Sequence, residues 1–232
     1  MTSLPATAPI GVIMLATRFP RPPGDIGHPD TLGGRGLYAR VEKARVARVV
    51  VEGPIDAEVV EAMAQAGNAL VERGAKLLTT SCGFACAIHD RLQADLPVPL
   101  VSSALNLLPT LAKRFADDAP IGILTFDGRV LSRRHFGRFW SPRAVIQGIE
   151  EGRELHRVIS KDLDTLDPRA AEADVLEAGD ALLARAPGCV AILLECTNLP
   201  PYRSALERRL GLPVFDLRDA LAGAGARLAR QL

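Results

Sequence analysis

The sequence has few aromatic residues, few cysteines and no excess of charge of either sign. Of its 232 residues 4% are aromatic and four are cysteine, and 28 Lys and Arg stand against 27 Asp and Glu. A chain so close to neutral has no general attraction for phosphate, which argues against a nucleic-acid partner. No stretch approaches the roughly 18 consecutive apolar residues of a membrane-spanning helix. Residues 1–17 also lack a basic start before an apolar run, so we expect a cytoplasmic protein with free thiols.

Short apolar runs alternate with longer segments of helical periodicity. The runs predict strands at Ile10–Leu15, Val46–Val51, Lys76–Thr79, Val98–Val101, Ile121–Phe126, Val190–Leu194 and Pro213–Phe215. The clearest helical patterns are Asp56–Arg73 and Asp167–Arg185, the second with Asp167 as cap and Pro168 in the first turn. Helices are also predicted over Phe84–Leu96, Ser103–Phe115, Leu199–Leu210 and Asp216–Leu232. This alternation predicts an α/β fold built on mostly parallel sheets.

Three landmarks occur twice in the same order, which predicts an internal repeat. The segment Ala8–Val12 (APIGV) returns 111 residues later as Ala119–Ile123 (APIGI), and Cys196 follows Cys82 by 114 residues. A Leu-Pro-Val at 96–98 returns after 116 residues at 212–214. We therefore expect two pseudo-symmetric α/β lobes over residues 1–108 and 109–232, each a mostly parallel sheet flanked by helices. The C-terminal helix is free to pack back onto the first lobe, and a cleft between the lobes is the natural ligand site.

Cys82 and Cys196 each lie between a predicted strand and a predicted helix. Free N–H groups and the positive end of a helix dipole at such turns favour a thiolate. The pKa of a free cysteine is about 8.5, so a modest downward shift of that pKa would give a base near neutral pH. A thiolate on one face of a substrate carbon and a thiol on the other form an acid–base pair that needs no cofactor. The alternative is two small buried apolar residues, the role we assign to Cys86 and Cys189. No C-x-x-C or His pair predicts a metal site.

The segment Arg18–Gly36, called the lid segment below, has four prolines, five glycines and no hydrophobic period. It follows the first predicted strand, where open α/β sheets place their ligand-binding loops. We therefore predict a mobile lid over the cleft. His28 lies in this segment near Asp25, and the sequence is equally consistent with contact to substrate and with a role in shaping the loop.

These motifs resemble the cofactor-independent aspartate/glutamate/hydantoin racemase superfamily over nearly the whole chain. Its members have two pseudo-symmetric α/β lobes and two facing cysteines. The resemblance therefore implies that Cys82 and Cys196 are the acid–base pair and that no cofactor or metal takes part. It also implies a small carboxylate as substrate, held by residues beside the two cysteines, by the end of a strand in the second lobe and by the lid segment. These implied substrate-binding residues are Gly83, Phe84, Thr125, Thr197, Asn198 and Asp25.

The sequence departs from the pattern of the amino-acid racemases at two places. Gly83 and Phe84 stand where Asn-Thr often follows the first cysteine, and Glu195 stands where Gly is common before the second. The loss of Asn-Thr removes side-chain donors for an amino-acid carboxylate. The motifs at residues 24–29, 81–84 and 194–202 resemble more closely a subgroup that includes the algal dimethylsulfoniopropionate lyase.

Three functions follow from these features. The leading hypothesis is a PLP-independent isomerase or racemase that removes and returns a proton next to a carboxylate. The alternative is a lyase that uses the same cysteines for β-elimination or decarboxylation, because a fold fixes the shared chemistry better than the substrate. The third, a carboxylate-binding protein without activity, is disfavoured by the presence of both cysteines. The sequence leaves a homo-oligomer open.

Overall fold

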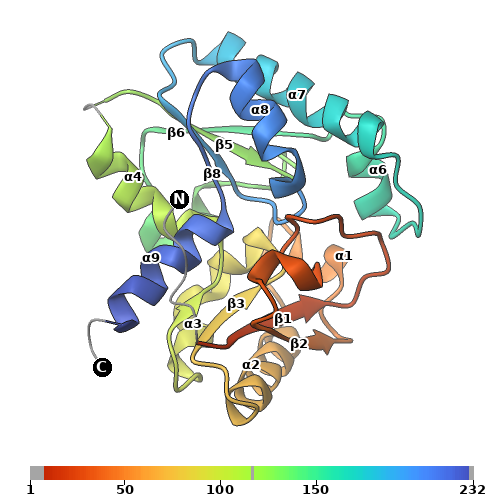
Figure 1. Ribbon diagram of the computed structural model, residues 1–232, viewed down its shortest axis with the longest axis vertical. Helices are drawn as coiled ribbons and strands as arrows, with labels where there is room; N and C mark the ends of the chain where they lie inside the picture. The colour runs from red at the N-terminus through yellow and green to blue at the C-terminus, as the bar shows by residue number, and fades with distance from the viewer. Residues whose placement is uncertain (1–7, 116–117, 230–232) are drawn as a thin grey trace.

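Two four-stranded parallel sheets organise the chain (Figure 1). The computed structural model describes residues 8–115 and 118–229. The first sheet has the order β2-β1-β3-β4 and the second has the order β6-β5-β7-β8. Their strands are β1 Ile10–Leu15, β2 Gly36–Val41, β3 Leu77–Thr80, β4 Leu100–Val101, β5 Ile121–Thr125, β6 Ala144–Gly148, β7 Ala191–Leu194 and β8 Val214–Phe215. The same strand order in both halves agrees with the sequence repeat, and the predicted fold class is confirmed.

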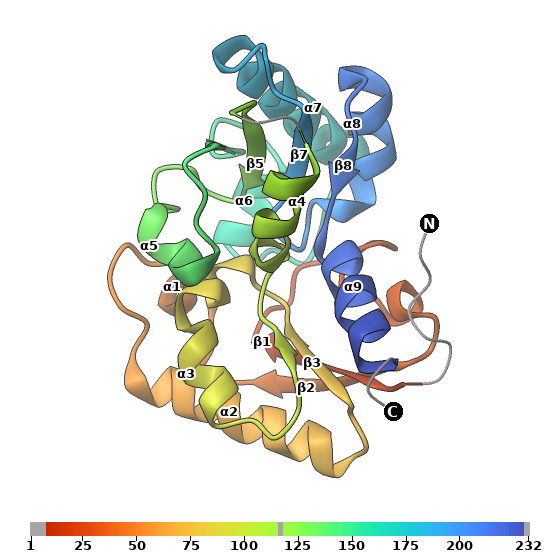
Figure 2. The ribbon, with the colours of Figure 1, turned by 90° about the vertical axis from the view of Figure 1, so that its left-hand side faces the viewer.

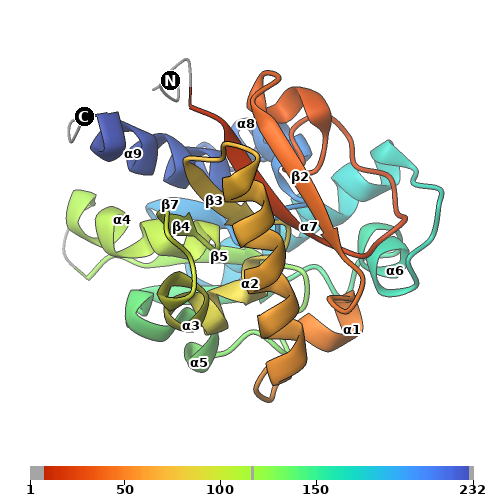
Figure 3. The same cartoon turned by 90° about the horizontal axis from the view of Figure 1, so that it is seen from below.

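Helices pack around and between the two sheets. They are α1 Val46–Val49, α2 Ala57–Glu72, α3 His89–Ala94, α4 Leu108–Arg114, α5 Arg133–Phe136, α6 Leu155–Ser160, α7 Pro168–Arg185, α8 Arg203–Leu210 and α9 Leu217–Ala229. The described residues also form five short 3-10 helices, which are η1 Pro29–Leu32, η2 Gly83–Ile88, η3 Ala104–Leu107, η4 Gly137–Phe139 and η5 Pro200–Tyr202. In Figure 3, α2 lies across the first sheet. As predicted, Asp167 caps α7, where its carboxylate accepts from the N–H groups of Arg169 and Ala170.

The repeat extends to how the long helices pack. A side chain on Gly11 of β1 would press on Leu70 of α2, and one on Gly122 of β5 would collide with Leu182 of α7. Glycine at the same place in each central strand therefore lets one long helix approach each sheet closely. The 112-residue spacing of Leu70 and Leu182 matches the spacing of the other repeated landmarks.

One hydrophobic core is shared by the two lobes. It contains β1 and β3 together with Ala191 and Leu193 of β7, whereas Ile192 and Leu194 face a second core under α7. This alternation follows from the two-residue period of a strand. Figure 2 shows α9 returning to the first lobe, where it contacts η3 and β4. In the other direction, the end of α4 reaches the second sheet, where the rings of Phe115 and Phe215 lie 6.1 Å apart.

Some predicted elements differ from the structure. The predicted strand Val46–Val51 is wrong, because Val46–Val49 forms the short helix α1. An apolar run of this length does not distinguish a strand from a buried helical turn. The edge strands β2 and β6 were not predicted, because most of their residues are only partly buried and they lack a continuous apolar run.

The predicted helix boundaries also need adjustment. The predicted helices at 84–96, 103–115 and 199–210 each begin as a 3-10 helix, and α9 ends at Ala229, so residues 230–232 of its prediction lie outside the described residues. The boundary predicted between residues 108 and 109 falls at the start of α4, between the two sheets. Among the described helices, none has the length and apolar character needed to cross a membrane.

Candidate active site

Two thiols from different lobes line one cavity. Cys82 follows β3 and begins η2, while Cys196 follows β7, so each lies where a parallel strand leads into a turn. Four residues that the resemblance assigned to substrate binding line the same cavity, namely Gly83, Phe84, Thr197 and Asn198. Since both sheets contribute residues from the carboxyl ends of their strands, the cavity lies where parallel α/β sheets bind ligands.

The other two assigned residues, Thr125 and Asp25, are fully buried behind the cavity wall. The hydroxyl of Thr125 donates a hydrogen bond of 2.7 Å to Oε2 of Glu195. The carboxylate of Asp25 accepts from Nδ2 of Asn198 at 2.5 Å and from the guanidinium of Arg21 at 2.9 Å. In this structure Thr125 and Asp25 therefore act on the cavity through the side chains that they hold in place.

Short hydrogen bonds join the two lobes around the thiols. The hydroxyl of Thr197, in the second lobe, donates to the carbonyl oxygen of Ser81 in the first lobe at 2.7 Å. The thiol of Cys196 donates to Oδ1 of Asn198 at 3.5 Å. Together with the bond from Asn198 to Asp25, these contacts fix the turn after β7 against both the first sheet and the lid segment.

Glu195, which precedes Cys196, fills the space beside Cys82. Its carboxyl is fully buried and lines the cavity. Oε2 accepts from Thr125, whereas Oε1 has no hydrogen-bond partner among the described residues. A side chain on Gly83 would collide with this carboxyl and with the carbonyl oxygen of Glu195. The two departures from the amino-acid racemase pattern are therefore one structural feature, because the missing side chain after Cys82 makes room for the carboxyl before Cys196.

Burial opposes the ionisation of both thiols. It raises the pKa of Cys82 to about 12 and the carboxylate of Glu195 adds to the rise, while the N–H groups of Phe84 and Ala85 lower it. Burial and Glu195 also raise the pKa of Cys196 well above its usual 9.0. Burial and the neighbouring carboxylate therefore shift both thiol pKa values upward, opposite to the downward shift expected from the two turns. The N–H groups are present, but desolvation and the neighbouring carboxylate outweigh them.

The lid segment forms one wall of the cavity, in agreement with its predicted position. Phe19 and Arg21 line the cavity, and the Arg21 guanidinium lies 4.6 Å from the centre of the Phe19 ring. Ile26 is buried and anchors the segment. His28 does not line the cavity; its Nδ1 accepts from the N–H of Asp30 at the start of η1, so it shapes the loop. The mobility of the segment stays a prediction.

The cavity is narrow, and a larger chamber adjoins it. Its free volume of about 20 Å³ has room for about one water molecule. The neighbouring chamber, of about 400 Å³, shares Thr17, Phe19 and Arg21 with the cavity and is also lined by Tyr38 and Arg40. The two spaces therefore adjoin at residues that include Phe19 and Arg21 of the lid segment.

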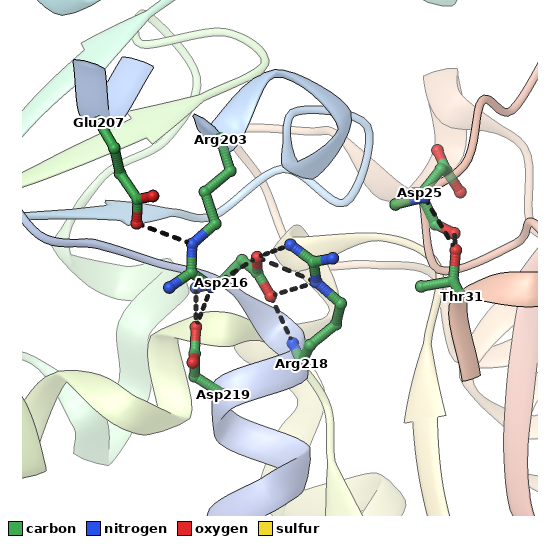
Figure 4. Close-up of polar contacts among 8 residues, drawn as sticks. Asp25, Thr31, Arg203, Glu207, Asp216, Arg218 and Asp219 are labelled. Carbon is green, nitrogen blue, oxygen red and sulfur yellow. Dashed lines mark hydrogen bonds and ion pairs between the residues drawn. The ribbon is translucent and has the colours of Figure 1, made fainter. Parts of the chain in front are cut away.

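A second polar cluster lies away from the cavity, at the end of β8 (Figure 4). The same view shows Thr31, whose hydroxyl donates to the carbonyl oxygen of Asp25 at 2.6 Å and closes the turn of the lid segment. In the cluster, buried Asp216 accepts from Arg203 at 3.1 Å and from Nε of Arg218 at 3.0 Å. Burial by itself would raise the pKa of Asp216, but these guanidinium groups hold that pKa below its usual value. The cluster joins α8 to the start of α9.

Arg21 and Glu195 were not assigned to the site from the sequence. Among the described residues, Arg21 is the only cation that lines the cavity. Nothing in the sequence distinguishes it from the other basic residues, because its position depends on the path of the lid segment. The sequence did contain an indication of Glu195, because a charged residue stands there directly after the apolar run of β7. Within the described ranges, no group of three or more His, Cys, Asp or Glu side chains is arranged to hold a metal ion.

Solved structures of low sequence identity share this fold. The allantoin racemase from Klebsiella pneumoniae superposes with a TM-score of 0.66 at 18% identity, covering 97% of this chain and 89% of that chain. An unliganded arylmalonate decarboxylase superposes with a TM-score of 0.58 at 16% identity, covering 96% of this chain and 93% of that chain. At such identities the likeness extends to the fold alone.

Curated relatives match at higher identity. The dimethylsulfoniopropionate lyase of Durusdinium sp. clade D is 28% identical over 217 residues, which are 90% of this chain and 71% of that protein. Dimethylsulfoniopropionate lyase 5 of Emiliania huxleyi (strain CCMP1516) is 31% identical over 225 residues, which are 91% of this chain and 44% of that protein. The family model for Asp/Glu/hydantoin racemases matches residues 50–225, about three quarters of the chain. Because this model matches most of the chain, and because the strands of both sheets follow the same order, the chain belongs to the Asp/Glu/hydantoin racemase family.

Proposed function

We propose that the protein is a cofactor-independent isomerase that removes and returns a proton at the carbon next to a carboxylate, with Cys82 and Cys196 as the acid–base pair. The observation that carries the proposal is the placement of these two thiols, which come from equivalent turns of the two lobes and line one cavity. A substrate carbon between them would be exposed to one sulfur on each face. Isomerisation needs this arrangement, since the proton leaves one face and returns to the other.

The surrounding residues supply what the proton transfer requires. One cysteine, as thiolate, takes the proton, and the electron pair left behind spreads onto the carboxylate oxygens. Arg21 is the cation available to that carboxylate, provided that it leaves or shares Asp25. The N–H groups of Phe84 and Ala85 stabilise a thiolate at Cys82, and the N–H of Asn198 does so at Cys196. The other cysteine, as thiol, then returns a proton to the opposite face.

A second candidate is a lyase, and the curated relatives favour it. The relatives named above are called dimethylsulfoniopropionate lyases, and each matches about nine tenths of this chain. In β-elimination one cysteine takes the same proton, and the electron pair expels a group from the next carbon instead of accepting a new proton. Loss of carbon dioxide from the same position would use the second thiol alone as proton donor. All these reactions pass through the same electron-rich carbon.

Exchange with solvent deuterium distinguishes these reactions. A panel of small carboxylates, incubated with the protein in deuterated buffer, is followed by NMR. Deuterium at the α-carbon of recovered substrate marks isomerisation, release of a β group marks elimination, and loss of a carboxyl marks decarboxylation. A protein that binds but does not react with any of them contradicts the proposal.

Serine substitutions test the two cysteines. A hydroxyl is far less acidic than a thiol, so Cys82→Ser and Cys196→Ser should each abolish interconversion. In a lyase, one of the two variants should be much milder, because one thiolate starts the reaction. Cys189→Ser is the matched control, because Cys189 is buried in the second core, outside the residues that line the cavity, and its sulfur hydrogen-bonds to backbone groups. Interconversion at the unsubstituted rate by both site variants would refute the two-cysteine mechanism. The cytoplasmic location stays a prediction.

A further inference from the structure

A continuous chain of hydrogen bonds leads from the lid segment to the sulfur of Cys196. The guanidinium of Arg21 and the backbone N–H of Gly27 donate to Oδ1 of Asp25, at 2.9 and 2.7 Å. Oδ2 of the same carboxylate accepts from Nδ2 of Asn198 at 2.5 Å. Oδ1 of Asn198 in turn accepts from the thiol of Cys196 at 3.5 Å. Asp25, Asn198 and Cys196 are all buried, so protein groups rather than bulk water satisfy these side chains.

The chain runs in one direction, because a carboxylate oxygen and an amide oxygen only accept hydrogen bonds. Asp25 is the ion-pair partner of Arg21 and is therefore a carboxylate. Asn198 must turn its NH2 group toward this carboxylate, which leaves its amide oxygen facing Cys196. The sulfur must then supply the proton of the last hydrogen bond. That bond exists only while Cys196 is a thiol.

The sulfur of Cys82 has different surroundings, although its turn is equivalent in the repeat. The backbone N–H groups of Phe84 and Ala85 donate hydrogen bonds to it, and among the described residues no group accepts one from its thiol. Donors alone stabilise a thiolate, whereas Asn198 offers Cys196 both a backbone N–H and an acceptor that requires a thiol. Burial raises the pKa of both thiols, so these contacts decide which of the two ionises more readily.

We propose that Asp25, acting through Asn198, is a positioning residue that keeps Cys196 as the proton donor and leaves Cys82 to act as the base. The inference rests on the proposed two-cysteine function and assigns each cysteine its starting role. Cys82 begins as a thiolate after releasing its proton to solvent. The C–H bond of the substrate then breaks, an S–H bond forms on Cys82, and the electron pair moves onto the substrate carboxylate. In isomerisation the S–H bond of Cys196 breaks as a C–H bond forms on the opposite face, so the negative charge ends on Cys196.

The assignment predicts which serine variant is the milder one if the protein is a lyase. β-Elimination needs a base but no returned proton, so Cys82→Ser should be almost inactive and Cys196→Ser should keep more activity. The reverse order overturns the role assignment while the two-cysteine function stands. If both variants keep the unsubstituted rate, the proposed function itself fails.

Asp25→Asn reverses the last hydrogen bond without changing the size of the side chain. Arg21 and Gly27 still donate to Oδ1, so the new NH2 group takes the place of Oδ2 and donates to Asn198. The amide of Asn198 must then rotate and present its NH2 group to Cys196, where it favours a thiolate. One hydrogen bond to a charged group is enough to speed the alkylation of Cys196 about tenfold at a fixed pH. The rate at Cys82 should stay unchanged.

Alkylation with iodoacetamide measures this without any substrate. The rates at Cys82 and Cys196 are followed by mass spectrometry between pH 6 and pH 10 in the unsubstituted protein and in Asp25→Asn. Asp30→Asn is the matched control, because it removes an exposed carboxylate from the same lid segment, and it should leave both rates unchanged. Infrared spectroscopy is the second measurement, because the S–H stretching band moves when a thiol changes its hydrogen bond. The band of Cys196, identified by its loss in Cys196→Ser, should be that of a hydrogen-bonded thiol and should shift or disappear in Asp25→Asn.

A double-mutant cycle separates the hydrogen bonds from the charge of Asp25. The charged or titratable groups that act on the sulfur of Cys196 or line its cavity are Glu195, Cys82, Asp25 and Arg21. Substitution of Asp25 therefore removes a repulsive charge as well as reversing the amide. In Asn198→Ala the amide is absent, so in that background Asp25→Asn should change the rate at Cys196 by less than about threefold.

Each outcome decides the inference. Faster alkylation of Cys196 alone, lost in the Asn198→Ala background, supports it. An equal gain in both backgrounds would mean that the charge of Asp25 acts through space, and equal changes at both cysteines would mean a structural role only; either result overturns the inference. It fails also if Asp25→Asn changes neither the rate nor the S–H band, or if the unsubstituted protein has no hydrogen-bonded S–H band for Cys196. None of these results depends on turnover, so they are independent of the deuterium exchange that tests the proposed function.

Discussion

The buried carboxyl of Glu195 should make the protein less stable as the pH rises. Burial raises its pKa from 4.5 to about 7 in the folded protein. Between these values the folded state binds a proton that the unfolded state has released, so the stabilising effect is complete below pH 4.5 and is lost as the pH rises through 7. The difference of about 2.5 pKa units, at about 1.36 kcal/mol for each unit, is about 3 kcal/mol in the free energy of unfolding.

Glu195→Gln removes this dependence, because the amide does not titrate. We expect the variant to gain stability relative to the unsubstituted protein by about 2.5 kcal/mol between pH 5 and pH 8. The measurement is urea unfolding of both proteins at pH 5, 6, 7 and 8, monitored by circular dichroism. The effects of all other titrating groups cancel in the difference between the two proteins. Glu177→Gln serves as control and should show a flat difference, because its side chain is exposed.

A constant difference between Glu195→Gln and the unsubstituted protein from pH 5 to pH 8 would refute the reasoning. It would mean that Glu195 titrates near its usual value, so that water or a cation reaches the carboxyl in solution. A difference of the opposite sign would mean that the folded state stabilises the carboxylate and lowers the pKa of Glu195.

Three further substitutions test other contacts. Gly83→Ala should cost about 1–3 kcal/mol in the free energy of unfolding, because the new methyl collides with Glu195, whereas Gly53→Ala, in open space, should be near neutral; equal melting temperatures would contradict this. Asp216→Ala should cost about 3 kcal/mol at pH 7, and because the pKa of Asp216 is lowered, the loss should shrink in urea titrations as the pH falls below 3.8. Asp174→Ala should cost about 1–2 kcal/mol, since its carboxylate accepts from three N–H groups at the start of α6; an unchanged urea midpoint would exclude this role.

The sequence predicted the features that depend on local pattern and on repetition. Buried central strands such as Ile121–Thr125 are continuous apolar runs, and a strong cap with proline defines the start of α7. The repeated cysteines could be matched because each follows such a strand. The edge strands were missed because their partly exposed residues lack that pattern, and Val46–Val51 was misassigned because its apolar run belongs to a helix that lines the cavity.

The electrostatics of the site could not be predicted in the same way. The turns after β3 and β7 do supply N–H groups to the sulfurs, as expected from the sequence. The direction of the pKa shift depends instead on burial and on the carboxyl of Glu195, and both follow from how the two lobes and the lid segment meet. Arg21 and Glu195 approach the thiols from separate parts of the chain, 174 residues apart in sequence, so their neighbourhood is a tertiary property.

The shared core has a consequence for cooperativity. Each half of the chain ends in a helix that reaches the other half, α4 toward the second sheet and α9 toward the first. A fragment of either half alone would expose the apolar faces of β1 and β3 or of Ala191 and Leu193, so neither should persist as a folded unit. The two halves should therefore melt in a single transition. For the same reason, separating the halves to admit a ligand to the thiols would break the shared core.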